Sequence, residues 1–145
     1  GVAFDGAYVW VANSNDGTVS KIDAESNTVV RSVNVGVYPT EVAFDGSNVW
    51  VTDWSSGGVS KIDAVSDAVV GRVSVGDSSI GVAFDGANIW VANNGDGTVS
   101  KIDAVSNVVA ASVNVGAVPI GLAFDGSNIW AANFNDDTVS KVPAG

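Results

Sequence analysis

Short apolar runs alternate with Asp-Gly and Asn-rich turns along the whole chain, and this pattern returns every 40 residues. The motif GVAFDG opens at Gly1 and again at Gly81, and close variants of it open at Glu41 and Gly121. Self-similarity at a fixed period is typical of repeat architectures, in which each unit is one small assembly of strands or helices. The chain therefore contains three full units and a shorter fourth, residues 121–145.

Each unit contains four short runs rich in Val, Ile, Thr, Phe and Trp, the residues that favour a pleated and packed sheet. In the third unit the predicted strands are 81–85, 88–93, 98–103 and 108–115. Asp-Gly follows the first run of every unit and predicts a type I′ hairpin turn, in which both central residues need a positive φ. No segment keeps an apolar period of about 3.6 residues, so we expect essentially no helix.

Four antiparallel strands in a unit of about 40 residues are typical of a β-propeller blade. Successive strand residues point to opposite faces, so Ile89 and Val91 lie on one face of the third unit and Trp90 on the other. Both faces are apolar, and each unit must therefore pack against its neighbours around a common axis. A tryptophan at the same position of every unit predicts a series of wedges between blades: Trp10, Trp50, Trp90 and Trp130.

The sequence thus predicts an all-β fold, a β-propeller of three complete four-stranded blades and a fourth that lacks its outer strand. The predicted blades are 1–40, 41–80, 81–120 and 121–145. Propellers have roughly four to eight blades, so three arrangements stay open: a segment of a larger ring, several copies that complete a ring, or a small closed ring of four. We expect self-association or additional blades, because an open end exposes an apolar face and an unpaired strand edge.

The second and third runs of each unit resemble the YVTN-type β-propeller repeat. The residues that carry this resemblance are WVAN at 10–13 and 90–93, WVTD at 50–53 and WAAN at 130–133, each followed by a turn and then TVSKID, GVSKID or TVSKV. The related NHL and streptogramin-lyase propellers share the opening of the blade. The resemblance covers the whole chain and implies strands that run from the central channel to the rim, at 2–5, 8–13, 18–24 and 28–35 in the first unit. It also implies a secreted, cell-surface or periplasmic location.

The composition excludes several classes of function. Six Lys and Arg residues stand against 16 Asp and Glu residues, a formal net charge of −10, and so acidic a surface repels nucleic acid and anionic membranes. The chain has no Cys and no His, which removes Cys nucleophiles, His bases and the usual zinc and haem ligands. No apolar run is long enough to span a bilayer. We expect no nucleic-acid partner and no membrane insertion.

Propellers of these families include enzymes, binding proteins and surface proteins, so the resemblance alone does not decide the function. Streptogramin lyases are understood to use a catalytic His in an acidic, magnesium-binding neighbourhood, and this chain has no His to take that role. We therefore predict a non-enzymatic scaffold without catalytic residues. The alternative is a fragment of a lyase-like propeller whose catalytic residues lie outside this chain. A recently amplified repeat without an evolved ligand is a further alternative.

The units differ mainly in the loops between their second and third strands and in the connections from one unit to the next. In a propeller these two sets lie on the same face, and a constant scaffold with one varied face is typical of a surface that binds a protein or a glycan. Free drift of solvated loop tips is the simpler explanation. Carboxylates beside aromatic rings could bind a sugar or a cationic group, and the candidate ligand site contains Tyr38, Glu41, Asp53, Trp54 and Phe134.

Two further sets of residues carry candidate chemistry. Weak calcium binding is a possibility in the turn that contains Asn133, Asn135, Asp136 and Asp137, although this turn lacks the ligand alternation of an EF-hand. We expect no other cofactor. A lysine recurs in the third run of each unit, with Asp two residues later in the first three units. This spacing predicts a row of rim ion pairs that contribute little stability individually.

Overall fold

The computed structural model describes all 145 residues and contains four antiparallel sheets, one for each repeat. Blade 1 consists of β1 (Val2–Phe4), β2 (Tyr8–Asn13), β3 (Thr18–Asp23) and β4 (Thr28–Asn34). Blade 2 consists of β5 (Pro39–Phe44), β6 (Asn48–Asp53), β7 (Gly58–Asp63) and β8 (Val69–Ser74). Blade 3 consists of β9 (Ser79–Phe84), β10 (Asn88–Asn93), β11 (Thr98–Asp103) and β12 (Val109–Asn114). Blade 4 consists of β13 (Pro119–Phe124), β14 (Asn128–Asn133) and β15 (Thr138–Pro143).

In every sheet the strands pair in the order in which they follow one another along the chain. The predicted all-β fold, with three four-stranded blades and a fourth that lacks its outer strand, is confirmed. The predicted strand bounds differ from the observed ones by one or two residues at the ends. A single 3₁₀ turn, Ser14–Asp16, is the only helical element. None of the structure's elements is a helix with the length and apolar character needed to cross a membrane.

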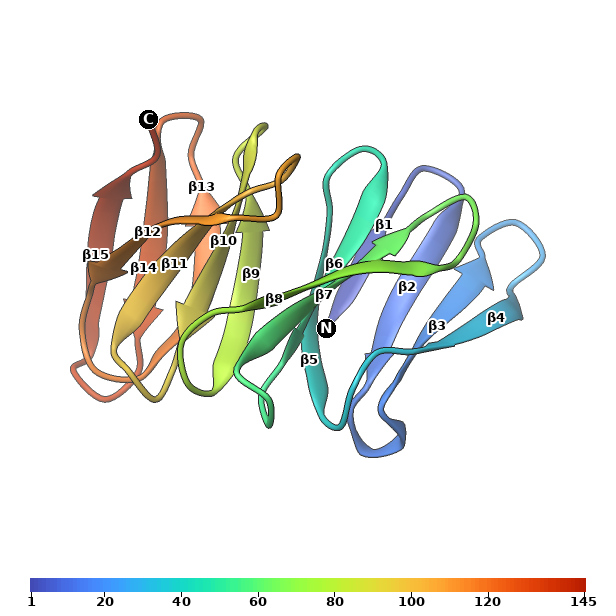
Figure 1. Ribbon diagram of the computed structural model, residues 1–145, viewed down its shortest axis with the longest axis horizontal. Coiled ribbons are helices and arrows are strands. Elements are labelled where there is room, and N and C mark those ends of the chain that lie inside the picture. Colours follow the sequence, from blue (N-terminus) through green and yellow to red (C-terminus); the bar gives the residue numbers. More distant parts are fainter.

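The blades stand side by side in an open array that runs from blade 1 to blade 4 (Figure 1). The first strands of consecutive blades contact one another, β1 with β5, β5 with β9 and β9 with β13. Blades 1 and 4 lie at opposite ends of the array (Figure 1). Among the three arrangements predicted from the sequence, the closed ring of four blades is therefore not the one that this chain adopts.

Each pair of neighbouring blades is joined by one apolar cluster, and each cluster is built in the same way. One blade contributes its tryptophan face, which carries the tryptophan of the second strand, and the next blade contributes its opposite, aliphatic face. The cluster between blades 1 and 2 combines Trp10, Val19, Val33 and Val35 with Val42, Val49, Val51 and Ile62. The same pairing recurs between blades 2 and 3 and between blades 3 and 4. The alternation predicted for β10 is confirmed, because Ile89 and Val91 face blade 2 while Trp90 faces blade 4.

The tryptophans fill the spaces between blades as predicted, with one exception. Trp10, Trp50 and Trp90 are almost completely buried, with 0%, 0% and 2% of their surface exposed. Trp130 is 37% exposed, because blade 4 has no further blade on its tryptophan face.

The repeated lysines do not form the rim ion pairs that the sequence predicted. Lys21 instead reaches the next blade, where its Nζ donates to the carbonyl oxygen of Ala64 (2.8 Å) and to Asp67 Oδ1 (2.7 Å). Lys61 makes the same contact with Ala104, and Lys101 with Ala144. The Asp two residues after each of these lysines is used locally instead. Its carboxylate accepts hydrogen bonds within its own turn from a serine three residues later.

The Asp-Gly turns close the first hairpins as predicted, but not as type I′ turns. Only the glycine has a positive φ, 105° at Gly6 and 98° at Gly46. The aspartate instead bends the chain with its side chain, since Asp5 Oδ1 accepts the backbone N–H groups of Ala7 (2.9 Å) and Tyr8 (2.7 Å). Asp and Gly are favoured in both kinds of turn, and the dipeptide alone therefore could not separate a type I′ turn from the turn observed.

We expect the substitution Trp50→Ala to lower the free energy of unfolding by about 3–5 kcal/mol, because it leaves a cavity in the contact between blades 2 and 3. The matched control is Trp54→Ala in the same blade, where the side chain is 45% exposed and the expected loss is under about 1 kcal/mol. Urea unfolding followed by far-UV circular dichroism measures both values. Equal losses for the two variants would contradict the role of the buried tryptophan as an inter-blade wedge.

Candidate functional site

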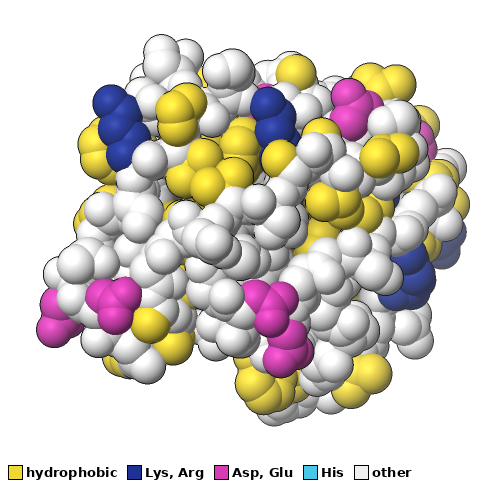
Figure 2. All heavy atoms as spheres, turned by 60° about the vertical axis from the view of Figure 1, so that its left-hand side comes forward, with side chains coloured by type: hydrophobic (Ala, Val, Ile, Leu, Met, Phe, Trp, Pro, Cys, Tyr) yellow, Lys and Arg dark blue, Asp and Glu magenta, His cyan; other side chains and the backbone are white.

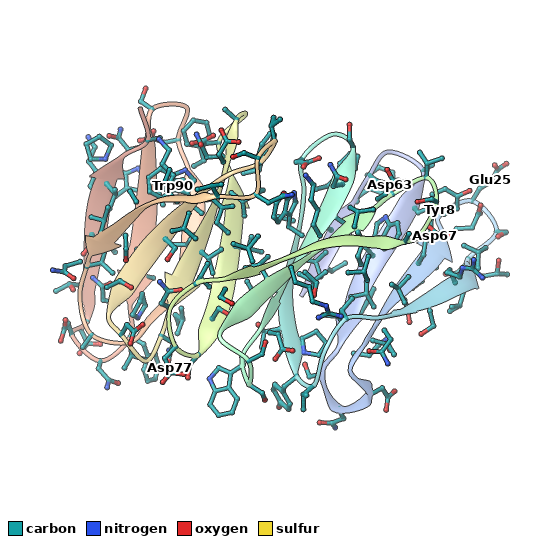
Figure 3. All side chains as sticks on the ribbon, viewed as in Figure 1. Tyr8, Glu25, Asp63, Asp67, Asp77 and Trp90 are labelled. Atoms are coloured by element: carbon teal, nitrogen blue, oxygen red, sulfur yellow. The ribbon has the colours of Figure 1, made fainter.

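The varied loops and the connections between blades form one surface, as predicted. We call it the loop face: the loops β2–β3, β6–β7, β10–β11 and β14–β15 together with the connections β4–β5, β8–β9 and β12–β13. The two sets are tied by backbone hydrogen bonds, for example from Trp54 N to Tyr38 O (3.1 Å) and from Phe134 N to Val118 O (2.9 Å). Asp77 marks this face at the lower edge of Figure 3, and Asp63 lies at the opposite end of its sheet.

Two of the predicted site residues form an aromatic pair on the loop face. Tyr38 and Trp54 meet edge to face, with ring centroids 5.9 Å apart and planes at 62°. Both rings stay open to solvent, with 41% and 45% of their surface exposed. Edge-to-face contact is a favoured arrangement of aromatic rings, so each ring supports the other while it remains accessible to a ligand.

The two predicted carboxylates have different surroundings. Asp53 is 3% exposed, and its carboxylate accepts the backbone N–H groups of Val37 (2.9 Å), Ser55 (2.9 Å) and Ser56 (3.2 Å). Glu41 is exposed on β5, beside the first residue of blade 1. Asp53 therefore braces the loop that carries Trp54, whereas the Glu41 carboxylate faces solvent.

Phe134 occupies in blade 4 the position that Trp54 occupies in blade 2. It is 65% exposed, and its backbone bond to the preceding connection matches that of Trp54. The structure therefore places Phe134 on the predicted face but two blades away from the aromatic pair.

The four residues of the predicted calcium turn are used in different ways. Asn133 is buried, and its Nδ2 donates to Thr138 Oγ1 (3.1 Å) and Ser140 Oγ (2.9 Å). Asp136 Oδ2 accepts the backbone N–H of Ala117 (2.6 Å). Asn135 and Asp137 are exposed. No group of three or more His, Cys, Asp or Glu side chains is arranged to hold a metal ion, and calcium binding by this turn remains a prediction.

Sequence reasoning missed a role for the aspartates of the Asp-Gly turns. In each blade the Nε1 of the inter-blade tryptophan donates to the Oδ2 of the aspartate five residues earlier, at 2.7 Å. The signal was present in the sequence, because an Asp precedes every one of these tryptophans by five residues. The aspartates line shallow hollows between blades on the face opposite the loop face, such as one of about 420 Å³ that Asp5 and Phe44 share. Donors within the blade already occupy these carboxylates.

The surroundings of these aspartates stabilise the ionised carboxylate. Burial would raise the pKa of Asp85, but the hydrogen bonds donated by Trp90, Asn88 and Ala87 outweigh it and hold this pKa below its usual value. The pKa of Asp45 is lowered by the same balance. At Asp125 the hydrogen bond from the exposed Trp130 is the largest cause of a lowered pKa. In the turns between third and fourth strands, the backbone and hydroxyl groups of a serine lower the pKa of Asp103.

A lowered pKa in the folded state means that these groups stabilise the fold above about pH 4, the pKa of an unfolded Asp, and that this stability is lost as the pH falls further. We expect a melting temperature that is nearly constant from pH 7 to 5 and decreases below pH 4. Asp85→Asn should lower the free energy of unfolding at pH 7 by about 1 kcal/mol and flatten the decrease in acid. The control is Glu25→Gln, whose exposed carboxylate accepts no hydrogen bond. Thermal scans across pH that show identical acid dependence in Asp85→Asn and the parent would refute this assignment.

Comparison with known proteins supports the fold. No protein-family model and no curated protein sequence matches the chain. Among solved structures, the chain is similar to hydrazine synthase of Kuenenia stuttgartiensis, with 26% identity over 88% of the chain and a TM-score of 0.81. It is also similar to the computationally designed protein Ika4, with 17% identity over 99% of the chain and a TM-score of 0.87. A third similar structure is the WD40 β-propeller domain of Doa1, with 13% identity over 99% of the chain and a TM-score of 0.83.

The chain spans 39% of the hydrazine synthase chain and 49% of the Doa1 chain, but 89% of Ika4. These likenesses, together with the four successive antiparallel sheets, show that the chain has a β-propeller fold.

Proposed function

We propose that this chain is a non-catalytic β-propeller scaffold that binds a protein or glycan partner on its loop face. The observation that carries the proposal is the pair of Tyr38 and Trp54, two large rings that touch each other and remain 41% and 45% exposed. Neither residue recurs in the other units: the position of Trp54 holds Ser, Asn or Phe there, and the position of Tyr38 holds Ser or Val. Aromatic rings of this kind anchor protein interfaces and stack on sugar rings.

The backbone beneath the pair is held in place before any ligand binds. Asp53 fixes both the loop that follows it and the connection that carries Tyr38, because it bonds to Val37 as well as to Ser55 and Ser56. A surface that is ordered in the free protein loses less conformational entropy on binding. The brace therefore favours recognition by a preformed face.

The charge of the chain narrows the class of partner. The loop face carries Asp77, Asp96 and Asp136, in a chain with a net charge of −10. Long-range repulsion disfavours anionic partners, and the faces of aromatic rings attract cations. A neutral or amine-bearing glycan, or a basic protein surface, fits this combination.

The proposal also covers the type of propeller repeat and the location of the protein. We infer a YVTN-type repeat protein that acts outside the cytoplasm, secreted, at the cell surface or in the periplasm, on the strength of the WVAN-type motifs. The lyase-like alternative requires catalytic residues beyond this chain. Further blades that contain histidine, in a longer gene that includes these repeats, would favour that alternative.

A panel of neutral and amine-bearing oligosaccharides and lysine-rich peptides, titrated against the chain by calorimetry, tests the proposal. For a ligand that binds, we expect Trp54→Ala and Tyr38→Ala each to raise Kd about tenfold or more, equivalent to about 1.4 kcal/mol. Phe134→Ala is the matched control on the same face and should change Kd less than about twofold. A panel without any binder, or a binder indifferent to both ring substitutions, would contradict the proposed site.

A further inference from the structure

The two ends of the blade array expose opposite halves of the contact that joins every pair of blades inside the chain. Blade 4 ends the array with its tryptophan face uncovered, and blade 1 ends it with its aliphatic face uncovered. Figure 2 turns the blade 4 end toward the viewer and shows hydrophobic side chains at the surface beside Lys or Arg side chains.

The uncovered tryptophan face of blade 4 has the residue types that are buried at the same positions of blade 3. Trp130 is 37% exposed where Trp90 is 2% exposed, and Val139 is 63% exposed where Val99 is completely buried. Each exposed residue of blade 4 occupies the same strand position as its buried equivalent in blade 3. The difference in exposure therefore comes from the absence of a blade next to blade 4.

The uncovered aliphatic face of blade 1 shows the converse. Val2 is 63% exposed, whereas the equivalent Val42 of blade 2 is 6% exposed. Val9 and Ile22 are half-buried, although their equivalents in blade 2 are completely buried. Phe4, at the edge of this face, is 58% exposed.

At the blade 4 end, the lysine that would bond to a next blade also has no partner. Lys21, Lys61 and Lys101 each donate to a carbonyl oxygen 43 residues further along, just after the third strand of the next blade. Lys141 lies over the Trp130 ring as the other lysines lie over theirs, but it is exposed and makes no such bond. By the same repeat offset, its partners in a neighbouring blade 1 would be the carbonyl oxygen of Ala24 and the side chain of Asn27.

We propose that a second copy of this chain covers these faces, head to tail, with the tryptophan face of blade 4 on the aliphatic face of the other copy's blade 1. Two copies of four blades give eight, within the usual range of propeller rings, and both ends of each chain are then covered. The contact is heterologous, and it forms a closed ring only if the rotation from blade to blade completes a circle. The second copy is favoured as the occupant because each exposed half already packs on its counterpart three times within the chain. The inference does not depend on the ligand proposed for the loop face.

Native mass spectrometry and light scattering of the 145-residue chain at micromolar concentration test the proposal. We expect a mass of twice the 14.6 kDa chain. A monomer would overturn the proposal and would leave the faces to some other occupant. A polymer would also overturn it, because two copies would then fail to close a ring.

Two substitutions test the direction of the contact. Trp130→Glu and Val2→Glu alter opposite ends of the chain, and each should convert the dimer to a monomer. Both side chains are partly exposed in the single chain, so the variants should fold, which circular dichroism and thermal melting verify. Phe134→Glu, in blade 4 but on the loop face, is the control and should remain dimeric.

A mixture of the two monomeric variants gives the decisive readout. Each variant keeps one intact face, so the mixture should form a heterodimer through one remaining contact, with a mass distinct from that of either homodimer. A dimer that survives Val2→Glu but not Trp130→Glu would mean that two tryptophan faces pack on each other, and the head-to-tail proposal would be wrong.

Discussion

The structure depends on a sheet that is apolar on both faces. A single four-stranded blade would leave Trp50 on one face and Val49 with Ile62 on the other in water. Packing between a tryptophan face and an aliphatic face removes both from solvent, and the same contact is used three times in the chain. Burial of apolar area is the largest favourable contribution to folding, so the stability of each blade derives from its neighbours as much as from its own hydrogen bonds.

Polar groups make this apolar contact directional. The lysines beside Trp10, Trp50 and Trp90 each donate to a backbone carbonyl oxygen of the next blade, and the aspartate of the Asp-Gly turn accepts the indole N–H from within its own blade. A buried amine or indole N–H without a partner is costly. A blade rotated or shifted relative to its neighbour would break the lysine bonds, and these bonds therefore fix the relative position of two blades more strictly than hydrophobic packing alone. The bond from each tryptophan to its aspartate lies within one blade and orients the ring for the contact.

Most of the fold could be predicted from the sequence because the repeat supplies the same local pattern four times. The position of β10, the alternation of Ile89 and Trp90, and the shared face of the varied loops follow from local rules of strands and turns. The target of Lys21 could not be predicted, because it lies 46 residues away at Asp67 and depends on how neighbouring blades are placed.

The role of Asp53 could not be predicted for a similar reason. Its carboxylate suggested a ligand group, yet it is occupied by backbone N–H groups that only the folded loop brings together. The sequence could indicate that Trp54 and Tyr38 are exposed, because neither residue recurs at its position in the other units. It could not show that the two rings touch, because their contact depends on the path of the β4–β5 connection.

The uniformity of the contact between blades has a consequence for how such a chain can change in length. Because the same positions of the repeat build all three junctions in the chain, a duplication or loss of one whole 40-residue unit would again bring a tryptophan face against an aliphatic face. A gain or loss of part of a unit would instead leave one apolar face of a blade exposed to solvent. A gene that encodes these repeats can therefore grow or shrink by complete units, and motifs that recur unchanged, such as GVAFDG at Gly1 and Gly81, agree with such growth.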